Sequence, residues 1–96
     1  MKPERTKVLF RWFRKEALAL FPAEAGTFDL STCFSYQQCG QHSSAGLAFC
    51  IQQSHPATPQ EYRDFAAELR RMGYRLEIRQ RATRKDFLNR KDQTTN

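Results

Sequence analysis

Every cysteine and histidine of the chain lies in one segment, residues 33–56, which reads CFSYQQCGQHSSAGLAFCIQQSHP and holds no Lys or Arg. These are the side chains that could bind a soft metal ion or act as a nucleophile. A structural zinc ion takes four thiolate or imidazole ligands at the corners of a tetrahedron. Cys39, His42, Cys50 and His55 would make such a set, with two thiols and two imidazoles.

The spacing of these four residues argues against a metal site. The segment has no C-x2-C pair. In the hairpin predicted below, Cys39 and His42 lie at the turn, Cys50 lies in mid-strand and His55 lies toward the opposite end. About five to six strand residues of roughly 3.3 Å each separate the two pairs. We therefore predict that the protein folds without zinc, that its thiols are not ligands, and that it needs no cofactor.

A thiol active site is the second chemical interpretation. His42 could activate Cys39, or His55 could activate Cys50. Catalysis would also need a residue that orients the histidine and a donor for an oxyanion, and the sequence indicates neither. A G-x-S-x-G nucleophile elbow and a glycine-rich phosphate loop are absent as well. We predict that the protein is not an enzyme, and we rank a small thiol or zinc enzyme last among three functional hypotheses.

The first element that would position these residues is a helix over residues 5–21. Leu9, Phe13, Ala17 and Leu20 recur at helical spacing. Pro22 would end the helix. The opposite side of this helix would carry the basic residues Lys7, Arg11, Arg14 and Lys15, with Trp12 beside them.

A hairpin follows, with strands over residues 27–36 and 47–52. In both segments apolar residues alternate with small or polar ones, which is typical of strands with one buried face. The turn between them, QQCGQHSSAG, is polar and contains Gly. The segment around the cysteines is therefore predicted to be a hairpin, with Cys33 and Cys50 on its polar face.

A second helix is predicted from residue 59 to residue 72. Thr58, Pro59 and Glu61 form a capping-box pattern, and Gly73 is a left-handed helix end. Alternation returns in residues 74–81, which predicts a third strand with Arg75, Arg79 and Arg81 turned outward. Residues 83–96 are polar and lack a period, so we expect a flexible basic tail.

These elements predict an α+β fold of order α-β-β-α-β. Residues 1–82 would form one domain, a three-stranded sheet with two helices packed on one face, which is a truncated ferredoxin-like order. The predicted core is a single cluster made of Leu9, Phe13, Leu20, Phe28, Leu30, Phe34, Leu47, Phe49, Ile51, Phe65, Leu69 and Ile78.

Charge is distributed unevenly along the chain. The net charge is +6, yet residues 22–58 carry two acids and no base. The N-terminal sequence MKPERTKVLF lacks the apolar stretch of a signal peptide, and no apolar run is long enough to cross a membrane. We therefore predict a cytoplasmic protein without membrane contact, whose cysteines are free thiols.

The basic residues indicate an anionic partner. The leading hypothesis is a non-enzymatic module that contacts the phosphate backbone of DNA or RNA. The alternative is an accessory protein of the phage or mobile-element type that docks on an acidic surface of a host DNA-processing enzyme. An unpaired sheet edge would also permit a dimer. The candidate binding residues for either partner are Lys7, Arg11, Trp12, Arg14, Lys15, Arg75, Arg79 and Arg81.

Overall fold

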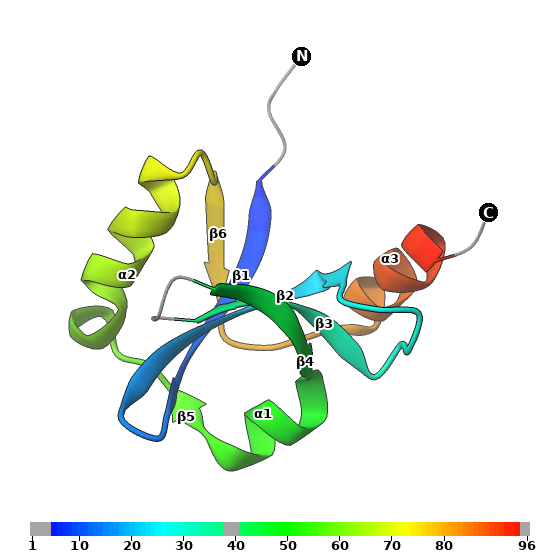
Figure 1. Cartoon of the computed structure of the whole chain (residues 1–96), viewed down its shortest axis with the longest axis horizontal. Coiled ribbons are helices and arrows are strands. Elements are labelled where there is room, and N and C mark those ends of the chain that lie inside the picture. The colour runs from blue at the N-terminus through cyan, green and yellow to red at the C-terminus, as the bar shows by residue number, and fades with distance from the viewer. Residues whose placement is uncertain (1–4, 38–40, 95–96) are drawn as a thin grey trace.

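In the residues that the structure describes, the protein is a small α+β domain of three helices and a six-stranded, mostly antiparallel sheet (Figure 1). The structure is a computed structural model and describes residues 5–37 and 41–94, with the backbone alone for residues 41–43. In chain order the elements are β1 (Thr6–Phe13), β2 (Glu16–Ala25), β3 (Thr32–Gln37), β4 (Gln41–Gly46), α1 (Leu47–Gln53), β5 (His55–Pro56), α2 (Pro59–Arg71), β6 (Leu76–Arg79) and α3 (Arg84–Thr94).

The sheet is an antiparallel meander extended at one edge. Its strand order is β4-β3-β2-β1, and two short strands share the outer edge of β1. β6 pairs in parallel with Thr6–Leu9, and β5 pairs antiparallel with Arg11 and Trp12. β4 and β6 are therefore edge strands, while β1 and β2 lie in the middle.

The predicted helix over residues 5–21 is wrong, because this segment is the β1–β2 hairpin. Both strands are central and are covered on both faces. Residues 8–11 and 17–22 are consequently buried without interruption, and the period of two that marks a half-buried strand is lost. The helical spacing of Leu9, Phe13, Ala17 and Leu20 is coincidental.

The second predicted strand, residues 47–52, is also wrong, because it forms α1. Leu47, Cys50 and Ile51 turn inward at spacings of three and four, a pattern that the apolar run LAFCI fits as well as alternation. The truncated ferredoxin-like order and the three-stranded sheet are replaced by β-β-β-β-α-β-α-β-α. Within β3, the predicted alternation places Phe34 and Tyr36 on the α2 face, as expected.

The second predicted helix is confirmed as α2. The Thr58 hydroxyl accepts from the backbone N–H of Glu61 at 3.2 Å, and the Glu61 carboxylate accepts from the backbone N–H of Thr58 at 2.9 Å. Gly73 has a φ of 106°, which suits a residue without a Cβ. β6 falls inside the predicted strand 74–81.

The predicted flexible tail contains α3, which packs along the end of β2 (Figure 1). Its contacts with the sheet are polar. Gln93 donates from Nε2 to Ala23 O and to the Glu24 carboxylate, and its Oε1 accepts from the backbone N–H of Ala25. The buried residues of α3 are Asp86 and Arg90, so no apolar stripe marks the helix in the sequence. None of the helices in the described ranges is long and apolar enough to span a bilayer.

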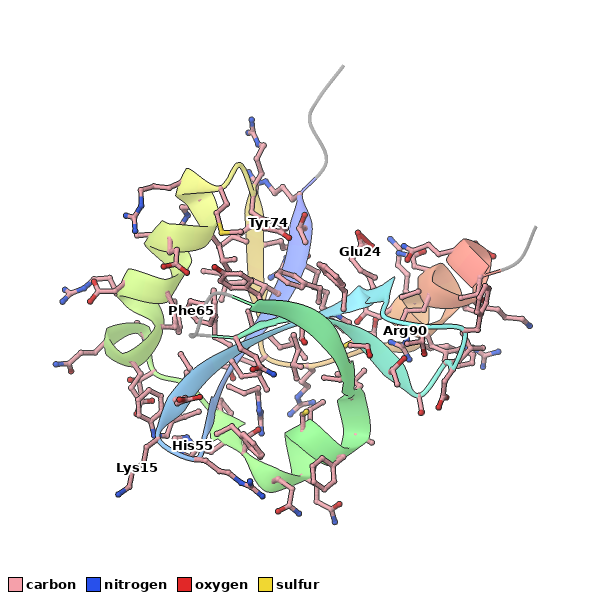
Figure 2. The ribbon with its side chains drawn as sticks, in the orientation of Figure 1. Lys15, Glu24, His55, Phe65, Tyr74 and Arg90 are labelled. Atoms are coloured by element: carbon pink, nitrogen blue, oxygen red, sulfur yellow. The ribbon has the colours of Figure 1, made fainter. Side chains whose placement is uncertain are left out.

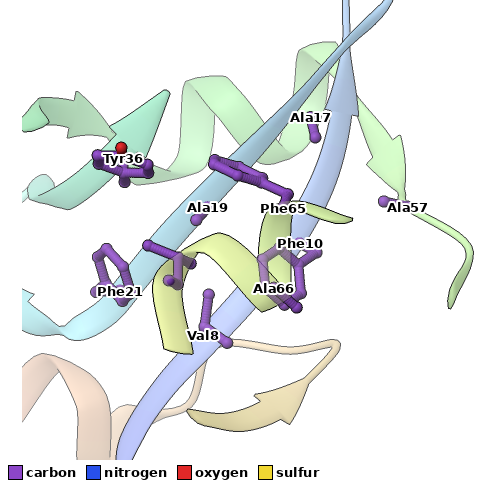
Figure 3. Packing of buried hydrophobic residues seen from close by; sticks show 10 residues of the cluster. Val8, Phe10, Ala17, Ala19, Phe21, Tyr36, Ala57, Phe65 and Ala66 are labelled. Atoms are coloured by element: carbon purple, nitrogen blue, oxygen red, sulfur yellow. The ribbon is translucent and has the colours of Figure 1, made fainter. Parts of the chain in front are cut away.

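The core is divided by the sheet into two clusters, so the prediction of one cluster is wrong. Beneath α2 (Figure 3), the cluster consists of Val8, Phe10, Ala17, Ala19, Phe21, Tyr36, Ala57, Phe65, Ala66 and Leu69. Beneath α1, the second consists of Leu9, Leu18, Leu20, Cys33, Leu47 and Cys50. Of the predicted core residues, Phe28 and Phe49 are wrong, since 86% and 57% of their surfaces are exposed.

Cys33 makes the stability of the second cluster depend on pH. Its side chain is fully buried, and burial raises the pKa of the thiol from 9.0 to about 12. The thiol ionises near pH 9 in the unfolded state and near pH 12 in the folded state. Ionisation of Cys33 therefore leaves the free energy of unfolding unchanged below pH 9 and lowers it progressively between pH 9 and pH 12. The loss is about 1.4 kcal/mol per pH unit. We expect urea midpoints to fall from pH 9 to 10.5 more steeply for the wild type than for Cys33→Ala. Equal decreases of the urea midpoint in the two proteins would contradict the raised pKa of Cys33.

Candidate anion-binding edge

The residues of the predicted basic helix stripe are distributed along the whole of β1 and its turn. Lys7 lies near the start of the strand, and Arg14 and Lys15 form the turn beyond its end. Seven residue steps of about 3.3 Å each separate Lys7 from Arg14, so the two ends lie roughly 23 Å apart. Trp12 is half-buried against the α2 cluster. The five residues therefore do not form one surface.

Arg11 is the clearest departure from that stripe, because only 6% of its surface is exposed. Its guanidinium donates from Nε to Ser54 Oγ at 2.8 Å, and from Nη2 to Ile51 O at 2.9 Å and Ser54 O at 2.8 Å. Burial lowers the pKa of the group. Arg11 thus binds carbonyls at the C-terminal end of α1, where a cation complements the helix dipole, and cannot face a ligand.

Arg14 and Lys15 are exposed at the hairpin tip, at the same end of the molecule as His55 (Figure 2). Both have positive φ values, 50° and 67°, which are unfavourable for residues with a Cβ. Tight two-residue hairpins of this kind favour Asn-Gly.

The hairpin tip therefore offers a stability prediction. We expect Arg14→Asn combined with Lys15→Gly to raise the free energy of unfolding by about 1 to 2 kcal/mol, because both new residues tolerate positive φ. Chemical denaturation measures the change. A destabilised double variant would mean that the Arg14 guanidinium, 5.1 Å from the Phe13 ring centroid, contributes more than the strain costs.

Arg75, Arg79 and Arg81 are exposed, as predicted, but the open polar sheet face predicted beside them is wrong. Cys33 and Ser35 are fully buried because α1 covers that face. Instead, Arg75 lies just before β6 and Arg79 is the last residue of β6, both at the sheet edge, and Arg81 lies on the connection to α3.

A polar pocket of about 330 Å³ opens where β6, the start of β1, the end of β2 and the first turns of α3 meet. β1 and β6 are parallel, and Lys7 lies opposite Glu77. The side chains of this pair therefore point to the same face of the sheet. The pocket is lined by Arg5, Thr6, Lys7, Ala23, Glu24, Glu77, Thr83, Lys85, Asp86 and Asn89.

The buried acid of this pocket is committed to the fold. Asp86 accepts from Lys7 Nζ at 2.7 Å and from the backbone N–H of Thr83 at 2.8 Å. The Lys7 and Asp86 side chains are only 15% and 6% exposed. Lys7 therefore fastens α3 to β1, and its charge is already compensated.

The other two acids of the pocket are also engaged. Glu77 accepts from Arg79 Nε at 3.2 Å, and Glu24 accepts from Gln93 Nε2 at 2.8 Å. Arg5 and Lys85 have no ion-pair partner among the described residues. An anion entering the pocket would thus meet two cations outside any ion pair, Arg5 and Lys85, and one carboxylate, Glu24, whose hydrogen-bond partner is a neutral amide.

Exposed cations continue from the pocket along the sheet edge. Arg75 lies beside Arg5, since the backbone N–H of Thr6 donates to Arg75 O at 2.6 Å. The chain then runs through β6 and a short connection into α3. We define the basic edge as Arg5, Arg75, Arg79, Arg81, Arg84 and Lys85, all of which are exposed.

Arg5, Arg84 and Lys85 were absent from the residues predicted to bind an anion. The helix assigned to residues 5–21 separated Arg5 from the last strand, and α3 was assigned to a tail. Thr83 and Asp86 carry a signal that could have located α3, because Thr-x-x-Asp is a form of capping box and precedes Phe87 and Leu88.

The cysteine and histidine segment is only partly described. Cys39 and the side chain of His42 lie outside the described residues, so the prediction of folding without zinc and the alternative of a Cys39–His42 pair both stay untested. Cys50 lies on α1 and His55 on β5. Where the structure describes side chains, no three His, Cys, Asp or Glu residues lie close enough to hold one metal ion.

Comparison with known proteins gives no family for this fold and basic edge: no family model, no curated protein and no solved structure matches the chain.

Proposed function

We propose that the protein is a non-enzymatic basic module that binds nucleic acid through its phosphate backbone, using the basic edge. One observation carries the proposal. Arg5, just before β1, and Lys85, on α3, line a polar pocket whose three acids each accept a hydrogen bond from another group. Guanidinium groups present forked donors that match phosphate oxygens, and most of the basic edge is arginine.

The composition of the basic edge favours duplex over single-stranded nucleic acid. Binding of a single strand normally relies on exposed aromatic rings on which bases stack. The described exposed aromatic residues are Phe28, Phe49 and Phe87, and none of them lines the pocket. Duplex binding requires mainly cations that follow the phosphates.

A pair of variants with equal net charge tests the location of binding. Arg5→Ala combined with Lys85→Ala removes the two uncompensated cations of the pocket. Arg14→Asn combined with Lys15→Gly removes two cations from the hairpin tip, so both variants change the net charge from +6 to +4. We expect the pocket variant to weaken duplex DNA binding at least about tenfold at roughly 100 mM salt, and the tip variant to have little effect.

Equal losses in the two variants would mean that binding follows net charge and has no preferred surface. A larger loss in the tip variant would move the site to the hairpin. Duplex RNA and single-stranded DNA serve as comparison ligands. Absence of binding to every nucleic acid would overturn the proposal and favour the hypothesis of a host-protein partner.

A further inference from the structure

The other side of α3 borders a different kind of surface. Lys85 and Asn89 line the polar pocket, whereas Phe87 lines an apolar groove of about 480 Å³ between α3 and α1. The apolar lining of the groove consists of Leu30, Leu47, Ala48, Ile51, Ala82 and Phe87. The groove is thus distinct from the polar pocket, although α3 contributes to both and Arg81 and Arg84 of the basic edge lie beside the groove.

The wall of the groove is held in place by Arg90. This buried side chain donates from Nη1 to Pro22 O at 2.5 Å and from Nη2 to Leu30 O at 3.0 Å. Its guanidinium also lies 5.6 Å from the ring centroid of Phe87. Because α3 is fixed to β2 and to the loop before β3, the groove is formed in advance, which lowers the entropy cost of binding.

Large apolar side chains are exposed on α1 and α3, and one of them, Phe87, lines the groove. α1 has no charged residue, and its Phe49 borders a second hollow of about 190 Å³ on the far side of the helix. On α3, Phe87 is 40% exposed and Leu88 is 44% exposed. Exposed apolar side chains gathered near concave surfaces mark a site of macromolecular contact.

The charge beside the groove is positive. Arg81 adjoins Ala82, Arg84 precedes Leu88 by four residues, and Lys91 follows Phe87 by four. Asp29, next to the lining residue Leu30, accepts from the backbone N–H and hydroxyl of Ser31 and keeps its negative charge, but the three cations outnumber it. A second copy of this chain would bring a like net charge of +6.

We propose that the groove between α1 and α3 binds an acidic amphipathic helix of a partner protein. The apolar face of that helix enters the groove, and its carboxylates meet the cations beside it. The apolar lining does not suit phosphate groups.

The test uses synthetic peptides of about 18 residues, roughly five helical turns. One peptide has Leu and Phe on one face and Glu on the other; a second has the same composition in scrambled order; a third has Lys in place of Glu. The protein variants are Ala48→Glu, in the groove, and Gln60→Glu, exposed on α2, which change the net charge equally. Binding is measured by fluorescence anisotropy of labelled peptide, and folding by thermal melting.

We expect the acidic amphipathic peptide to bind the wild type and the Gln60→Glu variant, and to bind Ala48→Glu at least about tenfold more weakly, because a like charge faces its carboxylates. Duplex DNA binding should be similar in Ala48→Glu and Gln60→Glu, which carry the same net charge, and this comparison separates the inference from the proposed function. Equal binding of the scrambled or Lys peptide would overturn it. Binding of anionic vesicles without binding of any peptide would also overturn it, and so would a dimer of the wild type that Ala48→Glu dissociates.

Discussion

Arg11→Ala should lower the free energy of unfolding by about 2 to 4 kcal/mol, although the residue is basic and lies in a segment rich in charge. The substitution leaves the carbonyls of Ile51 and Ser54 without the guanidinium that they now bind, at the end of α1. It also opens a cavity beside Leu9 and Ile51. Urea denaturation monitored by circular dichroism measures the loss.

Two further variants make this result specific. Arg11→Met keeps much of the apolar stem, so it should recover part of the packing while the hydrogen bonds stay lost. Lys15→Ala removes a cation from the exposed turn and should change stability by no more than about 0.5 kcal/mol. Equal, small effects of Arg11→Ala and Lys15→Ala would contradict the hairpin and restore the helix with a solvent-facing basic stripe.

Phe21→Ala should be the most destabilising single substitution in the α2 cluster, at about 3 to 5 kcal/mol. Phe21 is fully buried, and its ring centroid lies 5.3 Å from that of Tyr74 and 5.9 Å from that of Phe34. The ring thus connects β2, β3 and the segment before β6. Removing it leaves a cavity that these rigid strands cannot fill.

Phe28→Ala is the matched control, because 86% of that side chain is exposed. We expect a change within about 0.5 kcal/mol. The sequence pattern makes the opposite prediction for Phe28, which it assigns to the core. Thermal melting of the two variants side by side therefore decides whether the first strand after the hairpin begins at residue 27 or at Thr32.

Local signals in the sequence were reliable where a single residue type has a strong structural preference. The capping box of Thr58 and Glu61 and the left-handed Gly73 fix both ends of α2 without reference to the rest of the fold. Alternation was also informative for β3 and β6, where it correctly placed Phe34 and Tyr36, and Leu76 and Ile78, against the α2 cluster.

Periodicity failed where burial was not periodic. β1 and β2 are apolar on both faces, so a coincidental helical spacing prevailed, and the Arg14–Lys15 turn has none of the residues that usually mark a hairpin. The prediction missed α3 because its buried residues are an aspartate and an arginine, so no apolar period marks the helix. These two errors also hid the candidate site. The pairing of β1 with β6 and the packing of α3 bring Arg5, Arg75 and Lys85 to one edge, and neither was predicted.

The salt dependence of duplex DNA binding tests the central claim most directly. Each phosphate contact adds about 0.9 to the magnitude of the slope of log K against log salt, through the counterion that it releases. We predict measurable binding at about 50 mM salt, and a slope smaller by about two for Arg5→Ala with Lys85→Ala but unchanged for Arg14→Asn with Lys15→Gly. No binding at low salt, or a slope that the pocket variant leaves unchanged, would contradict a phosphate-binding role for the basic edge.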